Sequence, residues 1–349
     1  MYNVLVMGAG GNAARNYVSS LRLSNKIGQI IGVDTDPNSV YLSNCDITIV
    51  LNKNNDLLEA LHEIIAKHRI DYIHAQPEQN VRFLAEHQEQ FAIRGSFHDL
   101  EFYDKFADKM YCQNQWSEKL GLGFSMVYTL DECLENPKLF DSLLEKTGKA
   151  WIRARRGAGS KAALPISKIE HAQFWADYWR AKNEGVNDFV LSEFLPGSEY
   201  AVQMIWIKGK LMHLQARERI EYFFARQMPS GQSSTPSVSR VVNISDVSNL
   251  AHDIVKAIQD VPHGIYCADM KRNWNNEVIP TEVNYGRFFT TSYFFAQVGL
   301  NSPLDFLLAQ MGESIERKID YLNDNIYSYR GLDMPMKIVK IKNDEHTSK

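Results

Sequence analysis

The sequence predicts a chain in two parts, an α/β part with a mainly parallel sheet followed by an α+β part. Over the first hundred residues short apolar runs alternate with helical patterns, as they do in βαβ units. After about residue 150 the strand-like runs follow one another as in α+β proteins rather than as in a doubly wound sheet. At 349 residues the chain is also long enough for two or three domains.

The α/β part is expected to begin with a strand that ends in a glycine turn, Gly8 to Gly11, and to continue as a helix to about Leu23. From Leu57 onwards apolar residues recur at helical spacing, and Asn55 or Asp56 is the candidate N-cap. The expected strands of this part are Val4–Met7, Ile30–Val33, Ile47–Leu51 and Tyr72–Ala75.

The α+β part is expected to begin near residue 100 with helical sequence, in which Asp108-Lys109 opens a segment that closes on Gly121-Leu122-Gly123. The polar stretch Pro229–Ser239 is predicted to be a loop, and the charged chain after about Lys337 is predicted to be a frayed tail. The expected strands are Ala150–Arg153, Phe189–Phe194, Ala201–Ile207, Tyr266–Met270 and Val278–Val283.

The composition is that of a globular protein, with 44% apolar and 23% charged residues. No stretch approaches the roughly 20 apolar residues of a membrane span, and Met1 leads directly into a strand pattern without a secretion signal, so we expect a cytoplasmic protein. The four cysteines lie far apart with no CxxC pair, which indicates neither a zinc site nor disulfides. A net charge of -4, with one basic cluster at Arg153–Arg156, argues against a nucleic-acid partner.

The glycine turn at Gly8 to Gly11 is the first candidate site. Backbone amides at such a turn, and the positive end of the helix that follows, can bind an anion. The spacing is not GxGxxG, because Ala13 and Ala14 follow Asn12. A turn that merely leads the chain into the helix explains the pattern equally well.

The second candidate is the run from Arg153 to Lys161, in which a basic strand end leads into the small residues Gly157-Ala158-Gly159-Ser160. Amides of such a loop can surround phosphate oxygens, while a guanidinium at the strand end supplies fixed charge. The alternative is a solvated basic hairpin.

The third candidate is the most specific. Asp269 and the sequence Glu282-Val283-Asn284 end two strand-like runs that are separated by the turn residues Asn273 to Asn276. A hairpin folded at this turn would bring Asp269 beside Glu282, and strand alternation would put Glu282 and Asn284 on one face. Two carboxylates and an amide oxygen suit Mg²⁺. The alternative is a hairpin with a polar, solvent-facing side.

In this order the three motifs resemble the ATP-grasp superfamily, in particular carboxylate-amine ligases similar in architecture to the large chain of carbamoyl-phosphate synthetase. The resemblance covers nearly the whole chain. It implies a preliminary Rossmann-like, parallel-sheet domain on residues 1–105, followed by an ATP-grasp fold of two α+β subdomains. These would span residues 106–190, with a phosphate lid, and residues 191–337, with a metal site, before a flexible tail at 338–349.

The resemblance also implies ligands for individual residues. ATP and Mg²⁺ are the implied cofactors, and Lys109 and Arg153 would reach the phosphates of ATP. Arg287 would be a catalytic cation together with Arg153, although Tyr285-Gly286 stand between Asn284 and Arg287, where the family commonly has Arg two residues after the Asn. The remaining implied residues are Gly157, Gly159 and Ser160 for the lid, Glu193, Phe194 and Leu195 for the adenine hinge, Glu199 for the ribose, and Asp269, Glu282 and Asn284 for Mg²⁺.

The activity that the resemblance implies is activation of a small-molecule carboxylate as an acyl phosphate, which an amine then attacks. Alternatives are a small-molecule kinase of the same fold, an NAD-dependent oxidoreductase that uses the glycine turn and Asp34, and a non-catalytic nucleotide sensor. The expected partners are the carboxylate and the amine, with no nucleic acid and no membrane, and a homo-oligomer is one alternative for the assembly. Candidate cations for the substrate are Arg217, Arg219, Arg226 and Arg287, and candidate aromatic walls are Tyr285, Phe288, Phe289, Tyr293, Phe294 and Phe295.

Overall fold

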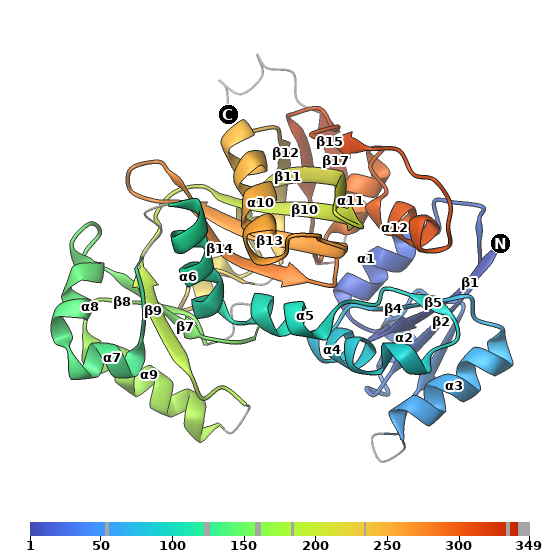
Figure 1. Ribbon diagram of the computed structural model, residues 1–349, viewed down its shortest axis with the longest axis horizontal. Coiled ribbons are helices and arrows are strands. Elements are labelled where there is room, and N and C mark those ends of the chain that lie inside the picture. The colour runs from blue at the N-terminus through green and yellow to red at the C-terminus, as the bar shows by residue number, and fades with distance from the viewer. Residues whose placement is uncertain are drawn as a thin grey trace.

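The computed structural model describes residues 1–52, 56–121, 126–157, 162–182, 185–233, 235–332 and 336–340. Within these residues the chain forms a five-stranded, a four-stranded and an eight-stranded sheet (Figure 1). The five-stranded sheet lies at one end of the molecule, the four-stranded sheet lies at the other, and the eight-stranded sheet lies between and above them (Figure 1).

The five-stranded sheet is parallel, as predicted, and its strands follow the order β3-β2-β1-β4-β5. The order therefore reverses between β1 and β4, and in sheets of this kind ligands bind outside the carboxyl ends of the two strands at such a switch point. Asp56 caps α3, since its Oδ1 accepts hydrogen bonds from the amides of Leu58 and Glu59. The elements are β1 (Tyr2–Met7), α1 (Asn12–Leu21), β2 (Ile27–Asp34), α2 (Ser39–Leu42), β3 (Ile47–Val50), α3 (Leu57–His68), β4 (Tyr72–Ala75), α4 (Glu78–His87), η1 (Gln88–Gln90) and β5 (Arg94–Gly95).

The four-stranded sheet is antiparallel, in the order β6-β9-β7-β8. Helices α7, α8 and α9 cover it (Figure 1). Asp108 begins α6 as its N-cap and Gly121 ends it in the left-handed conformation, as the sequence predicts. The elements from α5 onwards are α5 (Leu100–Ala107), α6 (Lys109–Leu120), β6 (Val127–Thr129), α7 (Leu130–Glu135), α8 (Pro137–Leu144), β7 (Ala150–Ala154), β8 (Leu164–Ile166), α9 (Ile169–Ala181) and β9 (Phe189–Glu193).

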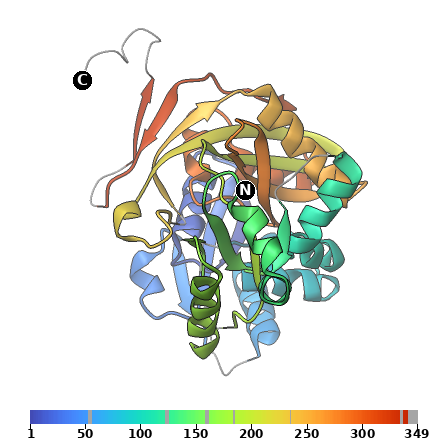
Figure 2. The same cartoon turned by 90° about the vertical axis from the view of Figure 1, so that its left-hand side faces the viewer.

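The eight-stranded sheet has the order β14-β13-β10-β11-β12-β16-β17, with β15 paired to β11. Its β16–β17 hairpin extends from one edge (Figure 2). The elements are β10 (Glu199–Ile207), β11 (Lys210–Tyr222), η2 (Ala225–Gln227), β12 (Pro236–Val242), α10 (Ser245–Ile258), β13 (Gly264–Arg272), β14 (Val278–Tyr285), α11 (Ser292–Gln297), α12 (Ser302–Gln310), β15 (Lys318–Ile319), β16 (Ile326–Tyr329) and β17 (Lys337–Lys340).

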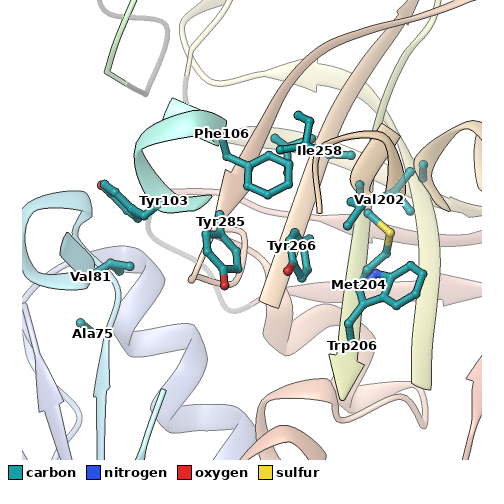
Figure 3. Close-up of a cluster of buried hydrophobic side chains, with 14 of the residues drawn as sticks. Ala75, Val81, Tyr103, Phe106, Val202, Met204, Trp206, Ile258, Tyr266 and Tyr285 are labelled. Atoms are coloured by element: carbon teal, nitrogen blue, oxygen red, sulfur yellow. The ribbon is translucent and has the colours of Figure 1, made fainter. Parts of the chain in front are cut away.

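One face of the eight-stranded sheet is apolar and packs against α5, α6 and α10. Met204, Trp206 and Tyr266 project from this face into a core that also contains Tyr103 and Phe106 of α5 (Figure 3). The same core includes Ala75 and Val81 of the amino-terminal part, so the two parts of the chain share one continuous apolar core. Because this face is buried, strand alternation leaves the opposite face free for polar residues.

Two expectations about irregular sequence are wrong. The predicted loop Pro229–Ser239 ends early, because β12 begins at Pro236 and pairs with β11 and β16. The predicted tail at 338–349 is a strand as far as Lys340, since β17 pairs with β16; residues 341–349 lie outside the described residues. Both segments contain β-branched residues, Val238, Val241 and Val242 in β12 and Ile338 and Val339 in β17, and main-chain pairing with adjacent strands holds them in the large sheet.

The expected domain boundaries at 105/106 and 190/191 fall inside α5 and β9. Since β9 belongs to the four-stranded sheet and β10 to the eight-stranded sheet, we propose residues 194–198 as the second boundary. Among the described residues no helix is both long and apolar enough to cross a membrane.

Candidate active site

Three predicted site positions lie in one row across the polar face of the large sheet. Ala201 of β10 pairs with Arg217 of β11 on one side and with Asp269 of β13 on the other, and Asp269 pairs with Glu282 of β14. Paired residues of an antiparallel sheet project to the same face. The side chains of Arg217, Asp269 and Glu282 therefore share this face, and the hairpin predicted from the turn at Asn273 is confirmed.

Two further rows flank the first. Two residues before Ala201 in β10, Glu199 pairs with Arg219 on one side and with Lys271 on the other. In the other direction Cys267 pairs with Asn284. A residue two positions from another in a strand lies on the same face, so Glu199, Arg219 and Asn284 also belong to the polar face.

A cleft lies between this face and the four-stranded sheet. Apolar side chains of β7 and of the segment after β9 contribute Trp151, Phe194 and Leu195 to its wall, whereas charged side chains line its other part. Of the predicted residues, those that line the cleft are Lys109, Arg153, Gly157, Glu193, Phe194, Leu195, Glu199, Asp269 and Glu282. Predicted residues Gly159 and Ser160 lie outside the described residues.

Lys109 and Arg153 bring positive charge to Glu282 from two different elements. The Nζ atom of Lys109, at the start of α6, lies 2.6 Å from the carbonyl oxygen of Gly157 and 3.5 Å from Oε2 of Glu282. Burial lowers the pKa of Lys109 and also that of Arg153, while Glu282 acts in the opposite direction. Burial raises the pKa of Glu282, but Lys109 and Arg153 outweigh it and hold that pKa below its usual value. Glu282 is therefore an ionised carboxylate between two cations.

Arg219 joins two carboxylates. Its Nη1 donates to Oε1 of Glu199 at 2.7 Å and its Nη2 donates to Oδ1 of Asp269 at 2.6 Å. Glu199 also accepts hydrogen bonds from the hydroxyl of Tyr222 and from Nε2 of Gln232, the latter at 2.9 Å. Burial, together with the neighbouring Glu282, raises the pKa of Asp269 to about 6, although Arg219 opposes the shift. Asp269 and Glu282 are therefore neighbouring buried carboxylates that depend on Arg219, Lys109 and Arg153 for charge compensation.

A second cavity, which we call the inner cavity, adjoins the cleft and reaches the amino-terminal part. Gln76, which follows β4, and Ala13, in the first turn of α1, line it, so it lies at the switch point of the parallel sheet. Asn284 and Arg287, two further predicted residues, line the inner cavity, and Nη2 of Arg287 donates to Oδ1 of Asn284. Four residues, Glu199, Arg219, Asp269 and Glu282, line both the cleft and the inner cavity and so mark their junction.

The remaining candidate residues from the sequence lie in different parts of the structure. Arg226 is exposed in η2 and lines neither the cleft nor the inner cavity. Phe288 and Phe289 line the inner cavity, whereas Phe294 and Phe295 are buried in the core behind it. At the glycine turn the amide of Gly10 donates to Oδ2 of Asp34 at 3.0 Å, so this amide already has a partner within the protein. Asp34 is thereby engaged within the protein.

Sequence reasoning missed several residues of the cleft. Gln113 lies one helical turn after Lys109, donates from Nε2 to the carbonyl oxygen of Pro280 at 2.7 Å, and has a buried Oε1 with no partner among the described residues. Its i to i+4 spacing from Lys109 on α6 is the one local signal that could have identified it. Tyr222 and Gln232 contact Glu199 because β11 pairs with β10 and the chain after β11 stays close to the start of β10. No local pattern predicts these two contacts.

The donor set at the junction fits a hard divalent cation. Asp269, Glu282 and Asn284 offer carboxylate and amide oxygens, which Mg²⁺ prefers together with phosphate and water oxygens. Burial and Glu282 raise the pKa of Asp269 although Arg219 contacts it, and a divalent cation shared by the two carboxylates would lower that pKa. Among the described residues no group of three or more His, Cys, Asp and Glu side chains could hold a metal, so a metal here would depend on the amide of Asn284 and on ligands from outside the chain.

Comparison with known proteins shows which solved structures have a similar fold. By sequence, no family model and no curated protein matches the chain. By structure, it is similar to the β-γ-ATP complex of biotin carboxylase from Campylobacter jejuni, with a TM-score of 0.71 and 13% identity over 93% of this chain and 74% of that one. N5-carboxyaminoimidazole synthetase from Staphylococcus aureus, complexed with ADP, gives a TM-score of 0.67 and 15% identity over 95% and 82%. L-amino acid ligase from Bacillus licheniformis gives a TM-score of 0.65 and 13% identity over 94% and 79%.

These neighbours are ATP-grasp proteins, and the chain has the ATP-grasp fold with a Rossmann-like amino-terminal part. The resemblance noticed in the three sequence motifs is thus confirmed at the level of the fold.

Proposed function

We propose that this protein is an Mg-ATP-dependent ligase that activates a small-molecule carboxylate as an acyl phosphate and passes it to an amine. The observation that carries the proposal is the junction of the two cavities. There the register-paired carboxylates of Asp269 and Glu282 lie beside Lys109, Arg153 and Arg219. Biotin carboxylase was crystallised with β-γ-ATP and N5-carboxyaminoimidazole synthetase with ADP, which supports a nucleotide in this fold.

In this proposal the cleft holds ATP. Backbone groups of Glu193, Phe194 and Leu195 grip the adenine, and Trp151 contributes an apolar wall. Glu199 faces the ribose. Lys109 and Arg153 hold phosphate oxygens and neutralise charge as the terminal phosphoryl group leaves ADP.

The junction holds the reacting groups. Asp269, Glu282 and Asn284 would hold Mg²⁺, which when bound neutralises charge on the phosphates and orients them. A carboxylate oxygen of the substrate in the inner cavity attacks the terminal phosphorus, and the bond to ADP breaks. The amine nitrogen then attacks the acyl carbon, loses a proton, and inorganic phosphate leaves. Arg287 lies where it can neutralise the oxyanion that forms in this second step.

The test is a screen for phosphate release over paired acids and amines in the presence of Mg-ATP, with products read by mass spectrometry. The expected product has the summed mass of acid and amine less one water. A phosphorylated acid that accumulates without consumption of the amine would indicate a kinase of the same fold and contradict the ligase. Glu282→Gln is the control, because activity from a contaminating enzyme would not respond to it.

Ligand-induced stabilisation separates the proposal from the oxidoreductase. A ligand that binds only the folded protein raises its melting temperature. Mg-ATP is expected to do so and NAD is expected to have no effect, because Asp34 is engaged by the amide of Gly10. Stabilisation by NAD together with indifference to Mg-ATP would reverse the assignment.

A further inference from the structure

Arg217 is a buried cation that forms no ion pair with a carboxylate among the described residues. Only 1% of the residue is exposed. Its polar partners are the hydroxyls of Ser239 and Thr291, and its guanidinium lies 4.2 Å from the centre of the Phe289 ring. Neutral hydroxyls and an aromatic face compensate a charge only in part, and burying an unpaired charge is costly.

The nearby carboxylates are already engaged elsewhere. Glu199 and Asp269 pair with Arg219, Glu282 lies 3.5 Å from Lys109, and Glu78 lies 4.0 Å from Arg287. Burial and the neighbouring Arg219 lower the pKa of Arg217 to about 9, while Asp269 acts against the shift. At neutral pH Arg217 is therefore still charged, and it lines the inner cavity without an ion pair of its own among the described residues.

The guanidinium has an edge free for an anion. Both of its hydrogen bonds to described residues leave from Nη1, and Nε has no partner among them. The Nε and Nη2 donors of arginine form the fork that a carboxylate accepts with two parallel hydrogen bonds. Phe289 and the two hydroxyls hold the guanidinium in place at the lining of the inner cavity, and neither hydroxyl accepts a hydrogen bond from Nε or Nη2.

The lining of the inner cavity also includes an unpartnered polar side chain from the amino-terminal part of the chain. Gln76 is 3% exposed, and neither its Oε1 nor its Nε2 has a partner among the described residues. It follows β4 and lines the same cavity as Arg217. The cavity has a volume of about 360 Å³, within the range of small-molecule sites. A ligand there would be held by Gln76 from one part of the chain and by Arg217 from the other.

The spacing of the sheet separates this anion from the reacting group. Ala201 lies between Arg217 and Asp269 in the row, so the main chains of these two residues are two strand spacings apart, about 10 Å. A carboxylate that is phosphorylated beside Asp269 and Glu282 is therefore a different group from one that pairs with Arg217.

We propose that one of the two substrates carries a second carboxylate that does not react, and that Arg217 binds it in the inner cavity. This inference rests on the proposed ligase function, which supplies the reacting carboxylate at the junction. The substrate is accordingly a small dicarboxylic acid, or the amine substrate is an amino acid that keeps its carboxylate.

Matched probes test the charge directly. Succinate and glutarate are compared with their monoamides, succinamate and glutaramate, which keep the size but lose one charge; β-alanine and β-alaninamide form the corresponding amine pair. Binding is measured by calorimetry in the presence of Mg²⁺ and a non-hydrolysable ATP analogue. We expect at least one charged probe to bind at least tenfold more tightly than its amide, and the acid and amine pairs reveal which substrate carries the group.

Variants assign the preference to Arg217. Arg217→Gln should abolish the discrimination and Arg217→Lys should restore part of it, because the charge returns without the fork. Gln76→Ala should weaken both members of the pair while keeping their ratio, and exposed Arg226→Gln should change nothing. Equal binding of each charged probe and its amide to the wild type, or discrimination that survives in Arg217→Gln, would overturn the inference.

The wild-type comparison does not depend on the folding of any variant, and the ATP analogue is titrated in the same preparations. Intact nucleotide binding without a preference for the charged probe would refute the role of Arg217 and leave the ligase proposal standing. Failure of the nucleotide to bind, with Arg217-dependent preference retained, would refute the ligase and leave the carboxylate site.

Discussion

Asp269 and Glu282 are register partners on adjacent antiparallel strands, β13 and β14, at the boundary between the cleft and the inner cavity. Neighbouring carboxylates repel each other, so this pair is stable only with cations around it. Arg219 and Lys109 provide part of that compensation within the chain. The paired carboxylate oxygens are the reason to expect a divalent cation, and they make the pair the most informative place for substitution.

Glu282→Gln keeps the size of the side chain but removes a charge. We expect it to lower turnover by roughly a hundredfold or more, since several kcal/mol of phosphoryl charge stabilisation is lost. Asp269→Asn should behave similarly, and the double variant should be little worse than either single one, because each change already disturbs the same ion. Steady-state rates at limiting Mg²⁺ measure this, with exposed Glu221→Gln as the control. Near-normal turnover of Glu282→Gln would show that the metal site is misassigned.

Lys109→Met tests the phosphate-binding charge at the start of α6. The variant keeps most of the apolar stem but removes the ammonium group 3.5 Å from Glu282. We expect about a hundredfold loss in kcat/KM for ATP, because a fixed positive charge in a buried site acts strongly on the transferring group. Lys119→Met is matched to it, since Lys119 is on the same helix and its Nζ also donates to a carbonyl oxygen, that of Ala257 at 2.6 Å. Equal effects of the two variants would contradict the assignment.

Asp108 connects α6 to the end of β7, and its loss should destabilise the protein. Its Oδ1 accepts from the amides of Met110 and Tyr111 and from Nε of Arg155, at 2.9 Å in the last case, while Arg156 donates to Oδ2 at 3.0 Å. Asp108→Asn should lower the free energy of unfolding by about 2 kcal/mol, because the arginines lose a largely buried carboxylate.

Urea unfolding of Asp108→Asn should be compared with that of Asp56→Asn, which changes an exposed N-cap of α3 in the same way. We expect the Asp56 variant to lose clearly less stability. If both substitutions cost the same, Asp108 acts as a helix cap alone and does not hold β7 to α6.

His98 makes stability depend on pH at the contact between the two parts of the chain. Its ring lies against Gly264 and Gly286, where a Cβ atom would come within 2.6 Å and 2.8 Å of the imidazole. Burial, together with the nearby His263, lowers the pKa of His98 to about 3. The native ring therefore stays neutral while the unfolded ring titrates near 6.5.

Between these two pKa values the unfolded chain binds more protons than the native one, so stability is fully present above pH 6.5 and is lost as pH falls towards 3. At pH 5 the loss from His98 is about 2 kcal/mol. His98→Gln should show correspondingly less change in unfolding free energy between pH 7.5 and pH 5, whereas exposed His62→Gln should follow the wild type. An unchanged pH dependence in His98→Gln would refute this account.

Local patterns were sufficient for the features that depend on neighbours in sequence. The turn at Asn273 and strand alternation predicted the pairing of Asp269 with Glu282, and α6 begins and ends where its capping residues predict. These features follow from backbone geometry over a few residues, which the sequence records directly.

Local patterns could not predict the side-chain contacts that depend on the order of strands in the sheet. Arg219 was one of four candidate cations for a substrate, yet it is bound to Glu199 and Asp269, because β10 lies between β11 and β13. The same order buries Arg217 two strands from Asp269. Since no periodicity specifies which strands become neighbours, charge networks across a sheet have to be read from the fold.

Transfer of oxygen-18 from the acid to phosphate reports whether an acyl phosphate forms. An acid and an amine that pass the phosphate-release screen are supplied with the label in the carboxylate of the acid, and the inorganic phosphate released is analysed by mass spectrometry. If an acyl phosphate forms, one carboxylate oxygen bridges carbon and phosphorus and leaves with the phosphate, so we expect one labelled oxygen per phosphate released. Phosphate without label, formed while the amine is consumed, would contradict activation of the carboxylate by the phosphoryl group of ATP.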